Sequence, residues 1–248
     1  MNKIDLHIHT NASYDGFNTL EQVIDKSIEK GLTTIAITDH DIITEELIGK
    51  RTRKIKGIEI ITGMEVSTNK GHVIGLFLDS PIKSRDFKET LIEIKNSNGL
   101  TYIPHPNRKN NGVSIKNIRE NIDLIDLIEY QNTYSLIKDM KLIDEEFRNK
   151  AVLFASTDSH KIEMIGSVIT IIDNKEQIET RELLLKNFPL KIDGDPFYTK
   201  MPYTVKGRLF NWLKTRVPLK NTNSLYNYFK IILIKLGIID KRFFRNVY

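Results

Sequence analysis

Short apolar runs alternate with segments of helical period along most of the chain. The runs are rich in Ile, Val and Leu, and the segments between them repeat apolar residues every three or four positions among charged ones. This alternation is typical of βα units arranged around a parallel sheet or barrel. We therefore expect an α/β fold.

The boundaries of the expected elements follow from this pattern and from turn and cap residues. The expected strands are residues 3–6, 34–38, 59–64, 72–77, 101–104, 124–128, 152–155 and 167–172. The expected helices are residues 19–30, 43–54, 84–96, 114–121, 135–149 and 175–187. Gly31 supplies the stop signal for the first helix.

Side chains that can bind metals follow the apolar runs directly. The first run leads to His7 and His9, with Asp15 six residues further on. Alternate side chains of an extended segment share a face, so the two imidazoles project the same way and can chelate an ion. Later runs end at further candidates, which are Asp39 and His40, Glu65, His105, and Asp158 with His160. In a barrel of βα units the C-terminal ends of the strands form the active face.

His72 is the exception, because it begins an apolar run instead of following one. Residues 68–71, Thr-Asn-Lys-Gly, are typical of a tight turn. A hairpin at this turn would bring His72 back beside Glu65.

Each candidate taken alone has an ordinary structural explanation. Asp39 can cap a helix, Glu65 can end a solvated strand, and His105 can lie in a turn between two prolines. Gathered at one end of a sheet, however, six histidines and several carboxylates would repel and desolvate one another unless cations neutralised them. The chain has no Cys, so a disulfide, a thiolate site and a cysteine nucleophile are excluded. Nitrogen and oxygen ligands without thiolate suit Zn, Mn or Fe.

Composition supports one main domain followed by a chemically different extension. The 248 residues are 40% hydrophobic, which suits a single α/β barrel. Residues 196–248 hold 11 of the 37 Lys and Arg residues but one acidic residue, Asp240. We therefore expect a domain at residues 1–195 and a basic, aromatic-rich extension at residues 196–248. The chain shows neither a signal-peptide pattern at its start nor an apolar run of about 18 residues, and we expect a cytoplasmic protein.

The ordered motifs resemble those of the PHP (polymerase and histidinol phosphatase) superfamily of metal-dependent phosphoesterases. The resemblance covers about residues 1–172 and rests on His-x-His, Ser-x-Asp-Gly, Thr-Asp-His, Gly-x-Glu, His-Val-x-Gly, Pro-His-Pro and Ser-x-Asp-x-His in that order. It implies a distorted seven-stranded βα barrel with up to three metals at its C-terminal face. A helical tail would follow the barrel.

The resemblance also implies which residues bind each metal, and all nine positions carry the usual residue types. The implied sets are His7, His9, Glu65 and Asp158 for one metal, Glu65, His72 and His105 for a second, and Asp15, His40 and His160 for a third. Glu65 would bridge the first two metals. Glu129 and Asn132 match a strand end of the family and are expected to support the ligands from behind.

Two departures from the family pattern bear on the substrate. The family often has Asp-His-Asp-Thr and a glycine where this chain has Asp41-Ile-Ile-Thr-Glu. In addition, about forty residues separate Glu65 from His105, too few for the capping domain that some members insert there. We therefore expect a more open site.

The implied chemistry is hydrolysis of a phosphoester by water activated between metals, which requires no protein nucleophile. Glu65, Asp158 and His160 are the expected catalytic ligands. Three cations next to ligands in the sequence are candidates to hold a phosphate, namely Arg108, Lys109 and Lys161.

The predicted function is therefore a metal-dependent phosphatase acting on a small phosphomonoester, such as a nucleotide or histidinol phosphate. A nuclease using the same metals is the nearest alternative, and a binding module with a structural metal cluster is another. An amidohydrolase also opens with His-x-His, but it would need a bridging Lys, and Asp15 and the terminal Asp-x-His motif suit that scheme poorly. The sequence does not specify an oligomeric state.

The C-terminal extension combines cations with 11 of the 21 aromatic residues of the chain. One interpretation is a helix packed on the barrel, since Tyr226 and Phe229 precede an aliphatic run. The others are a surface that binds an anionic membrane or single-stranded nucleic acid. Of these two binding interpretations we favour the membrane, because the aliphatic run exceeds what base stacking needs.

Overall fold

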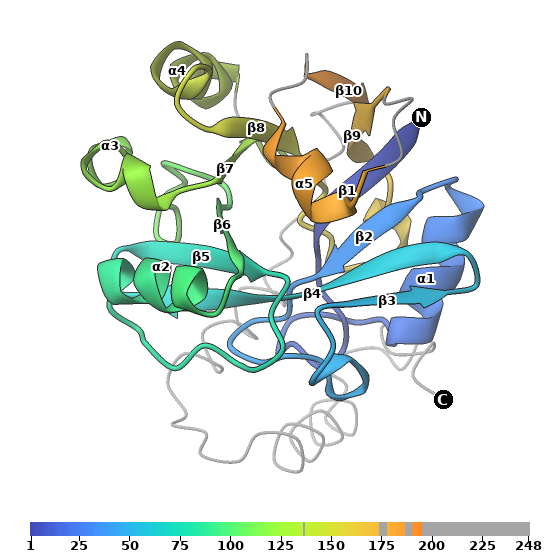
Figure 1. Ribbon diagram of the computed structural model, residues 1–248. Helices are drawn as coiled ribbons and strands as arrows, with labels where there is room; N and C mark the ends of the chain where they lie inside the picture. The colour runs from blue at the N-terminus through green and yellow to red at the C-terminus, as the bar shows by residue number, and fades with distance from the viewer. Residues whose placement is uncertain (136, 174–177, 187–189, 195–248) are drawn as a thin grey trace, which may run out of the picture. The chain divides into compact units, whose positions relative to one another are not determined.

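The computed structural model describes residues 1–135, 137–173, 178–186 and 190–194 (Figure 1). The predicted basic extension at residues 196–248 lies outside them. Seven strands run through the sheet in the order β1 (Asn2–Ile8), β2 (Thr34–Ile37), β4 (Ile58–Thr68), β5 (Gly71–Leu76), β6 (Leu100–Ile103), β7 (Leu127–Gln131) and β8 (Val152–Ala155).

The two ends of this seven-strand path meet and nearly close the sheet. Just beyond β8, Ser159 bridges to Ile8 of β1, and the backbone N–H of His9 donates to the Ser159 carbonyl at 2.9 Å. The pairs on either side of β5 are antiparallel, whereas β1 pairs with β2, β2 with β4, β6 with β7 and β7 with β8 in parallel. The predicted distorted seven-stranded α/β barrel is confirmed.

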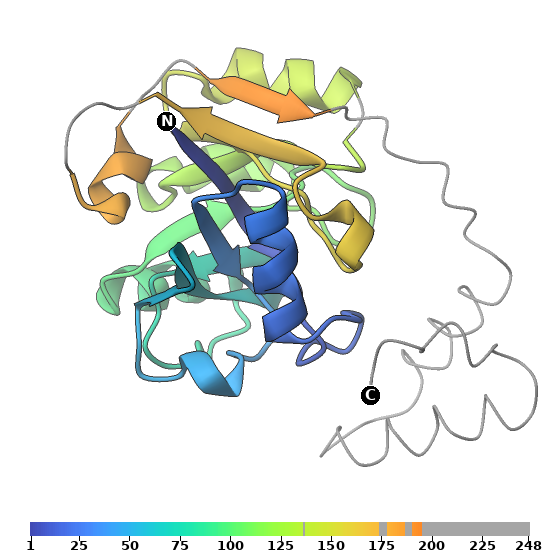
Figure 2. The ribbon, with the colours of Figure 1, turned by 90° about the vertical axis from the view of Figure 1, so that its right-hand side faces the viewer.

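Three further strands extend the sheet at its margins. β3 (Thr52–Ile55) pairs with β4, β9 (Val168–Ile172) pairs with β1, and β10 (Lys191–Gly194) pairs with β9, all antiparallel. Figure 2 shows β9, in gold, beside the dark blue β1. The sequence pattern indicated β9 but neither β3 nor β10.

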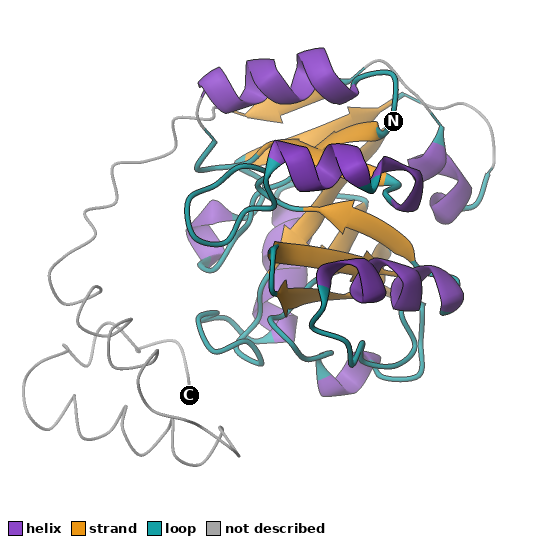
Figure 3. Cartoon of the chain, turned by 90° about the vertical axis from the view of Figure 1, so that its left-hand side faces the viewer, coloured by secondary structure: helices purple, strands orange, loops and turns teal. Residues whose placement is uncertain are grey.

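Helices cover the outside of the strands (Figure 3). They are α1 (Leu20–Glu29), α2 (Phe87–Asn96), α3 (Ile115–Glu120), α4 (Ile137–Phe147) and α5 (Thr180–Leu185). The first three begin at side chains that accept hydrogen bonds from backbone N–H groups of the first turn, which are Thr19, Asp86 and Ser114. Single 3₁₀ turns lie at Glu45–Leu47, Ile122–Leu124 and Ile162–Met164.

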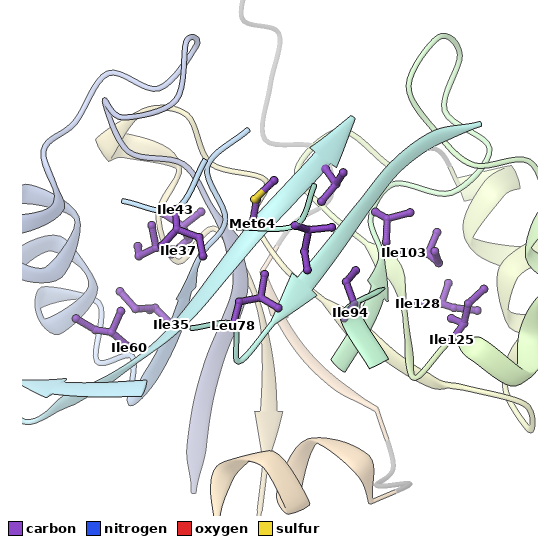
Figure 4. Close-up of a cluster of buried hydrophobic side chains, with 14 of the residues drawn as sticks. Ile35, Ile37, Ile43, Ile60, Met64, Leu78, Ile94, Ile103, Ile125 and Ile128 are labelled. Atoms are coloured by element: carbon purple, nitrogen blue, oxygen red, sulfur yellow. The ribbon is translucent and has the colours of Figure 1, made fainter. Parts of the chain in front are cut away.

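The hydrophobic core has two layers, separated by the alternation of side chains along the strands. One layer contains Ile35, Ile60 and Ile128 together with Ile94 of α2, and therefore lies between strands and helices (Figure 4). The other contains Ile61 and Leu127, which face the barrel interior with Tyr102, Phe154 and neighbouring apolar residues. Glu65 lies four residues after Ile61 in β4, and Glu129 lies two residues after Leu127 in β7. Residues an even number of positions apart in a strand share a face, so both glutamates lie on the same face of the sheet as the inner layer.

One expected helix, residues 43–54, is wrong. Ile43 and Leu47 are both buried and four residues apart, which imitates a helical period. The chain makes a single 3₁₀ turn there, turns at Gly49 with a φ of 76° and then pairs residues 52–55 with β4. Strand pairing therefore outweighs the local pattern.

Other boundaries differ by smaller amounts. The strand expected at residues 124–128 is Leu127–Gln131, because Ile122–Leu124 forms a 3₁₀ turn. In the last expected helix the structure has Thr180–Leu185, while residues 175–177 and 187 lie outside the described part. Among the described residues, no helix is long and apolar enough to cross a membrane.

Candidate metal centre

The nine predicted metal ligands gather at one place. His7, Glu65 and His72 belong to strands, and the other six lie in segments that follow strands. All nine fall in four overlapping groups, and within each group the donor atoms lie within 4.8 Å of one another. The groups are His9, Asp15, His40 and His160; His7, His105 and Asp158; His7, His9 and Glu65; and His40, Glu65 and His72. The structure therefore brings together every residue of the predicted set.

The first predicted set converges on a common point. Nε2 of His7, Nε2 of His9 and Oε2 of Glu65 are each 3.1 Å from the other two. Oδ1 of Asp158 lies 3.4 Å from the His7 nitrogen and 3.7 Å from the His9 nitrogen. Donor atoms bound to one ion at bonds of about 2.0–2.2 Å stand roughly 3 to 3.6 Å apart. Most of these spacings suit a shared ion.

Glu65 joins this set to the second through its other oxygen. Oε1 lies 2.8 Å from Nδ1 of His72 and 3.0 Å from Nε2 of His105. The predicted hairpin makes the contact possible, since Thr68 pairs with Gly71 and Ser67 with His72 across the turn. One carboxylate thus presents its two oxygens to two groups of imidazoles.

The third predicted set lies beside the first. Oδ2 of Asp15 is 3.1 Å from Nε2 of His160 and 3.4 Å from Nε2 of His40. Nδ1 of His160 donates to the Asp158 carbonyl at 3.0 Å, so Nε2 keeps its lone pair. Ser13 orients the loop, because its hydroxyl donates to Asp15 and accepts from the backbone N–H of His40.

The backbone of the loops is shaped to aim these side chains. His105 has a φ of 31° and Asp158 a φ of 56°, which is the left-handed region that non-glycine residues rarely adopt. Gly16 passes so close to the Thr10 carbonyl that a Cβ would lie 1.8 Å from its oxygen. Strain of this kind is held where the surrounding structure fixes the chain, and it is common at functional sites.

Glu129 and Asn132 lie behind the ligands, as the resemblance implies. Oε1 of Glu129 is 3.1 Å from Nδ1 of His7, and Oε2 accepts from the His105 backbone N–H at 2.7 Å and from Asn132 Nδ2 at 2.8 Å. A carboxylate only accepts, so Nδ1 of His7 donates to Glu129, and in the neutral imidazole that a metal requires Nε2 offers its lone pair. Tyr102 also donates to Glu129, at 3.2 Å, a contact that the sequence analysis missed.

Two buried aspartates tie the loops to the barrel. Asp39 accepts from the backbone and hydroxyl of Thr10, at 2.7 and 2.8 Å, and from the Thr44 hydroxyl. It is not the helix cap that Asp39 alone suggests. Asp5 accepts from the backbone and hydroxyl of Thr157 at 3.0 and 2.6 Å. The apolar residues around Asp5 in β1 are the sequence signal for its burial.

The three predicted phosphate-binding cations differ in position. Nη1 of Arg108 lies 2.7 Å from Oδ2 of Asp158, while Nη2 is buried without a hydrogen-bond partner among the described residues. Lys161 follows His160 and has its ammonium 5.8 Å from the centre of the Phe17 ring. Lys109 is exposed. Arg108 is therefore the cation that the structure places against a predicted ligand.

Charge in the centre favours bound cations. Burial opposes ionisation of Glu65, yet the charges of His40 and His7 hold its pKa well below the usual range. Burial likewise opposes ionisation of Asp158, and His7 and Arg108 hold its pKa well below the usual range. Conversely, burial would lower the pKa of His7, but Asp158 and Glu65 raise it well above its ordinary value. The carboxylates therefore attract positive charge.

Buried histidine nitrogens without hydrogen-bond partners also indicate that the centre binds ions. His9, His40 and His105 each have a buried Nδ1 without a hydrogen-bond partner among the described residues. Buried polar atoms normally have a partner in protein, water or an ion. The donor set contains imidazole and carboxylate and no thiolate, which fits divalent ions such as Zn, Mn or Fe.

Comparison with known proteins agrees with the fold. The PHP domain family model matches residues 5–192. The chain therefore belongs to the PHP domain family. A two-domain protein of Bacteroides vulgatus that contains a predicted PHP-like metal-dependent phosphoesterase has a similar structure, with a TM-score of 0.59 and 19% identity over 78% of this chain and 64% of that one.

Curated relatives include one that matches nearly the whole chain and others with named activities. The first is an uncharacterized protein of Methanocaldococcus jannaschii, which is 26% identical over 93% of this chain and 96% of its own length. A 5′-3′ exoribonuclease of Haemophilus influenzae is 38% identical over 31% of this chain, and a 3′,5′-nucleoside bisphosphate phosphatase of Chromobacterium violaceum is 35% identical over 32%. Each of these two matches spans 29% of the relative. Both named activities are hydrolyses of phosphoesters.

Proposed function

We propose that the protein is a metal-dependent phosphatase that hydrolyses a small phosphomonoester with an activated water. The observation that carries this proposal is the position of Glu65, whose two carboxylate oxygens face two different groups of imidazoles at 2.8 to 3.1 Å. A bridging carboxylate of this kind is suited to hold two divalent ions close together. Membership of the PHP domain family supports the same function.

The nine residues would hold the ions in the sets named above, with Glu65 shared between the first two. When bound, divalent ions such as Zn, Mn or Fe would supply Lewis acidity and a water of lowered pKa. The residues of the chain fix where this chemistry takes place. Glu129 sets the tautomer of His7 and holds the backbone of His105, so it positions ligands of both sets.

Arg108 is the residue we assign to the phosphate. Its Nη1 remains on Asp158, and its buried Nη2 has a hydrogen to donate. An anionic oxygen beside Asp158 would meet that need with a charge-assisted hydrogen bond. The contact would keep the phosphorus next to the ligands, whereas Lys109 and Lys161 would add charge at the rim.

Hydrolysis of p-nitrophenyl phosphate tests this function. Protein purified without chelator should release p-nitrophenol in the presence of Mn²⁺, and a chelator should abolish the reaction. Activity that persists in chelator would contradict the proposal, as would no activity with Mn, Fe and Zn each supplied in turn.

A nuclease is the second candidate, and the similarity to the exoribonuclease of Haemophilus influenzae favours it. The same donor set would serve a phosphodiester. The two activities separate in a parallel assay with a 5′-phosphorylated oligoribonucleotide and with AMP. If the protein releases mononucleotides from the oligomer but no phosphate from AMP, its function is that of a nuclease and the proposed phosphatase function is wrong.

A further inference from the structure

One tyrosine hydroxyl is buried in the apolar inner layer of the barrel. The Tyr102 side chain is fully buried and packs with Leu127 and Phe154. A phenylalanine would fill the same space without a polar atom, and a buried hydroxyl lowers stability unless it is hydrogen-bonded. The Tyr102 hydroxyl has two partners, Glu129 at 3.2 Å and Ser156 at 3.0 Å. It therefore links the inner layer to the carboxylate that supports the predicted metal ligands.

The direction of these hydrogen bonds follows from their chemistry. A carboxylate only accepts, so the single hydroxyl hydrogen of Tyr102 goes to Oε1 of Glu129. The Tyr102 oxygen then accepts from the Ser156 hydroxyl, whose own oxygen accepts from the backbone N–H of Leu6 at 3.3 Å. Burial and the charge of Glu129 hold the pKa of Tyr102 well above its ordinary value, so the donor keeps its hydrogen. This chain of donors starts in β1 and ends at Glu129.

Among the described residues, Glu129 has four donors, two on each oxygen. Oε2 accepts from Asn132 and from the backbone N–H of His105, and the donors to Oε1 are His7 and Tyr102. The terminal torsion of a glutamate has no sharply preferred angle, so the donors determine how the carboxylate is turned. His7 is itself the ligand that must be oriented, whereas the apolar layer holds the Tyr102 ring. Tyr102 therefore supplies the fixed contact that directs Oε1 toward Nδ1 of His7.

We propose that Tyr102 is a positioning residue for the ion that His7 binds, and that it acts through Glu129. Its hydroxyl holds Oε1, Oε1 holds Nδ1 of His7, and Nε2 of His7 then faces Glu65 and Asp158. The inference rests on the proposed function, because it concerns the metal centre of the same site. Other donors hold the second oxygen of Glu129, so the effect should fall on one ion.

The variant Tyr102→Phe removes the hydroxyl and keeps the ring. Zn²⁺ affinity of the full chain is measured by titration against a competing chelator, and urea unfolding shows that each variant folds. One ion should bind about 3- to 10-fold more weakly, as expected for the loss of one hydrogen bond, while the other ions bind as in the wild type. Tyr130→Phe is the matched control. It makes the same change one residue after Glu129, in a side chain that packs against the outer layer, and should bind Zn²⁺ as the wild type does.

Two further comparisons separate positioning from a general loss of stability. If Tyr102 acts through Glu129, Tyr102→Phe should change Zn²⁺ affinity less than about twofold once Glu129 is already Gln, whereas a structural role would give the same fold-change in both backgrounds. The visible absorption of bound Co²⁺ depends on the arrangement of its ligands and should change in Tyr102→Phe but not in Tyr130→Phe. Should the single variant be unstable, Tyr102→Phe combined with Ser156→Ala leaves no hydroxyl of the pair unpartnered and should show the same loss of affinity.

The outcomes distinguish this inference from the function on which it rests. Zn²⁺ affinity that Tyr102→Phe leaves unchanged, or an equal loss in both backgrounds, would overturn the inference and leave the phosphatase in place. Weaker binding of one ion, in a protein that does not hydrolyse p-nitrophenyl phosphate, would support the inference and reject the phosphatase. A wild-type protein that binds no Zn²⁺ would overturn both.

Discussion

Oε1 of Glu129 lies 3.1 Å from Nδ1 of His7, and both side chains are buried. The contact turns Nε2 of His7 toward Glu65, so a residue outside the ligand set determines how a ligand is presented. Glu129 also holds the backbone of His105. Two of the predicted metal positions therefore depend on one carboxylate.

Glu129→Gln should weaken metal binding by about 10- to 100-fold, because the amide can donate a hydrogen where His7 and His105 require an acceptor. Metal affinity is measured by titration against a competing chelator. Glu120→Gln, at an exposed position of α3, is the control and should bind metal as the wild type does. If the two variants bind metal with equal affinity, Glu129 does not position the metal ligands.

Glu65→Gln should lower metal content and turnover together. The substitution removes the charge that both groups of imidazoles face, and the loss of phosphatase activity should be at least about 100-fold. Metal content and hydrolysis rate are measured on the same preparation. Near-normal activity at full metal occupancy would show that Glu65 does not bridge.

Arg108→Lys should raise KM for the phosphate ester about 10- to 100-fold, since a lysine carries the charge but cannot serve Asp158 and a phosphate oxygen with two fixed nitrogens. Steady-state kinetics with p-nitrophenyl phosphate measure the change. Lys116→Ala, an exposed cation on α3, is the control. An unchanged KM for Arg108→Lys would show that a residue other than Arg108 binds the phosphate.

Asp39→Asn should destabilise the fold by about 1–3 kcal/mol, because the buried carboxylate accepts three hydrogen bonds from Thr10 and Thr44. Urea unfolding measures the change. Asp25→Asn removes an exposed partner of Lys56 and should cost at most about 1 kcal/mol. If both variants lose the same stability, Asp39 does not anchor the loops.

The sequence predicted which residues lie together in the candidate metal centre, because the signals for them are local. Each ligand comes at or just after an apolar run, and strand ends in a barrel of βα units meet at one face. His72 needed one additional inference, the hairpin at residues 68–71, which the pairing of Thr68 with Gly71 confirms. The apolar run that predicts a strand therefore also predicts where the metal-binding residue at the end of that strand lies.

Contacts between distant segments were harder to predict. The pairing of residues 52–55 with β4 depends on a neighbour that the helical spacing of Ile43 and Leu47 does not reveal. The hydrogen bond from Tyr102 to Glu129 likewise joins residues that are 27 positions apart in the sequence. A side chain that acts through a tertiary contact leaves little trace in the pattern of its own segment.

The metal content of the full chain, purified without chelator and measured by mass spectrometry of its metals, decides whether the nine residues form a metal centre. We expect two to three divalent ions per chain, falling by at least one in Glu65→Gln, with Zn, Mn or Fe as the ions found. A wild-type protein that binds no divalent ion, even after incubation with each of these metals, would show that the nine residues do not form a metal centre.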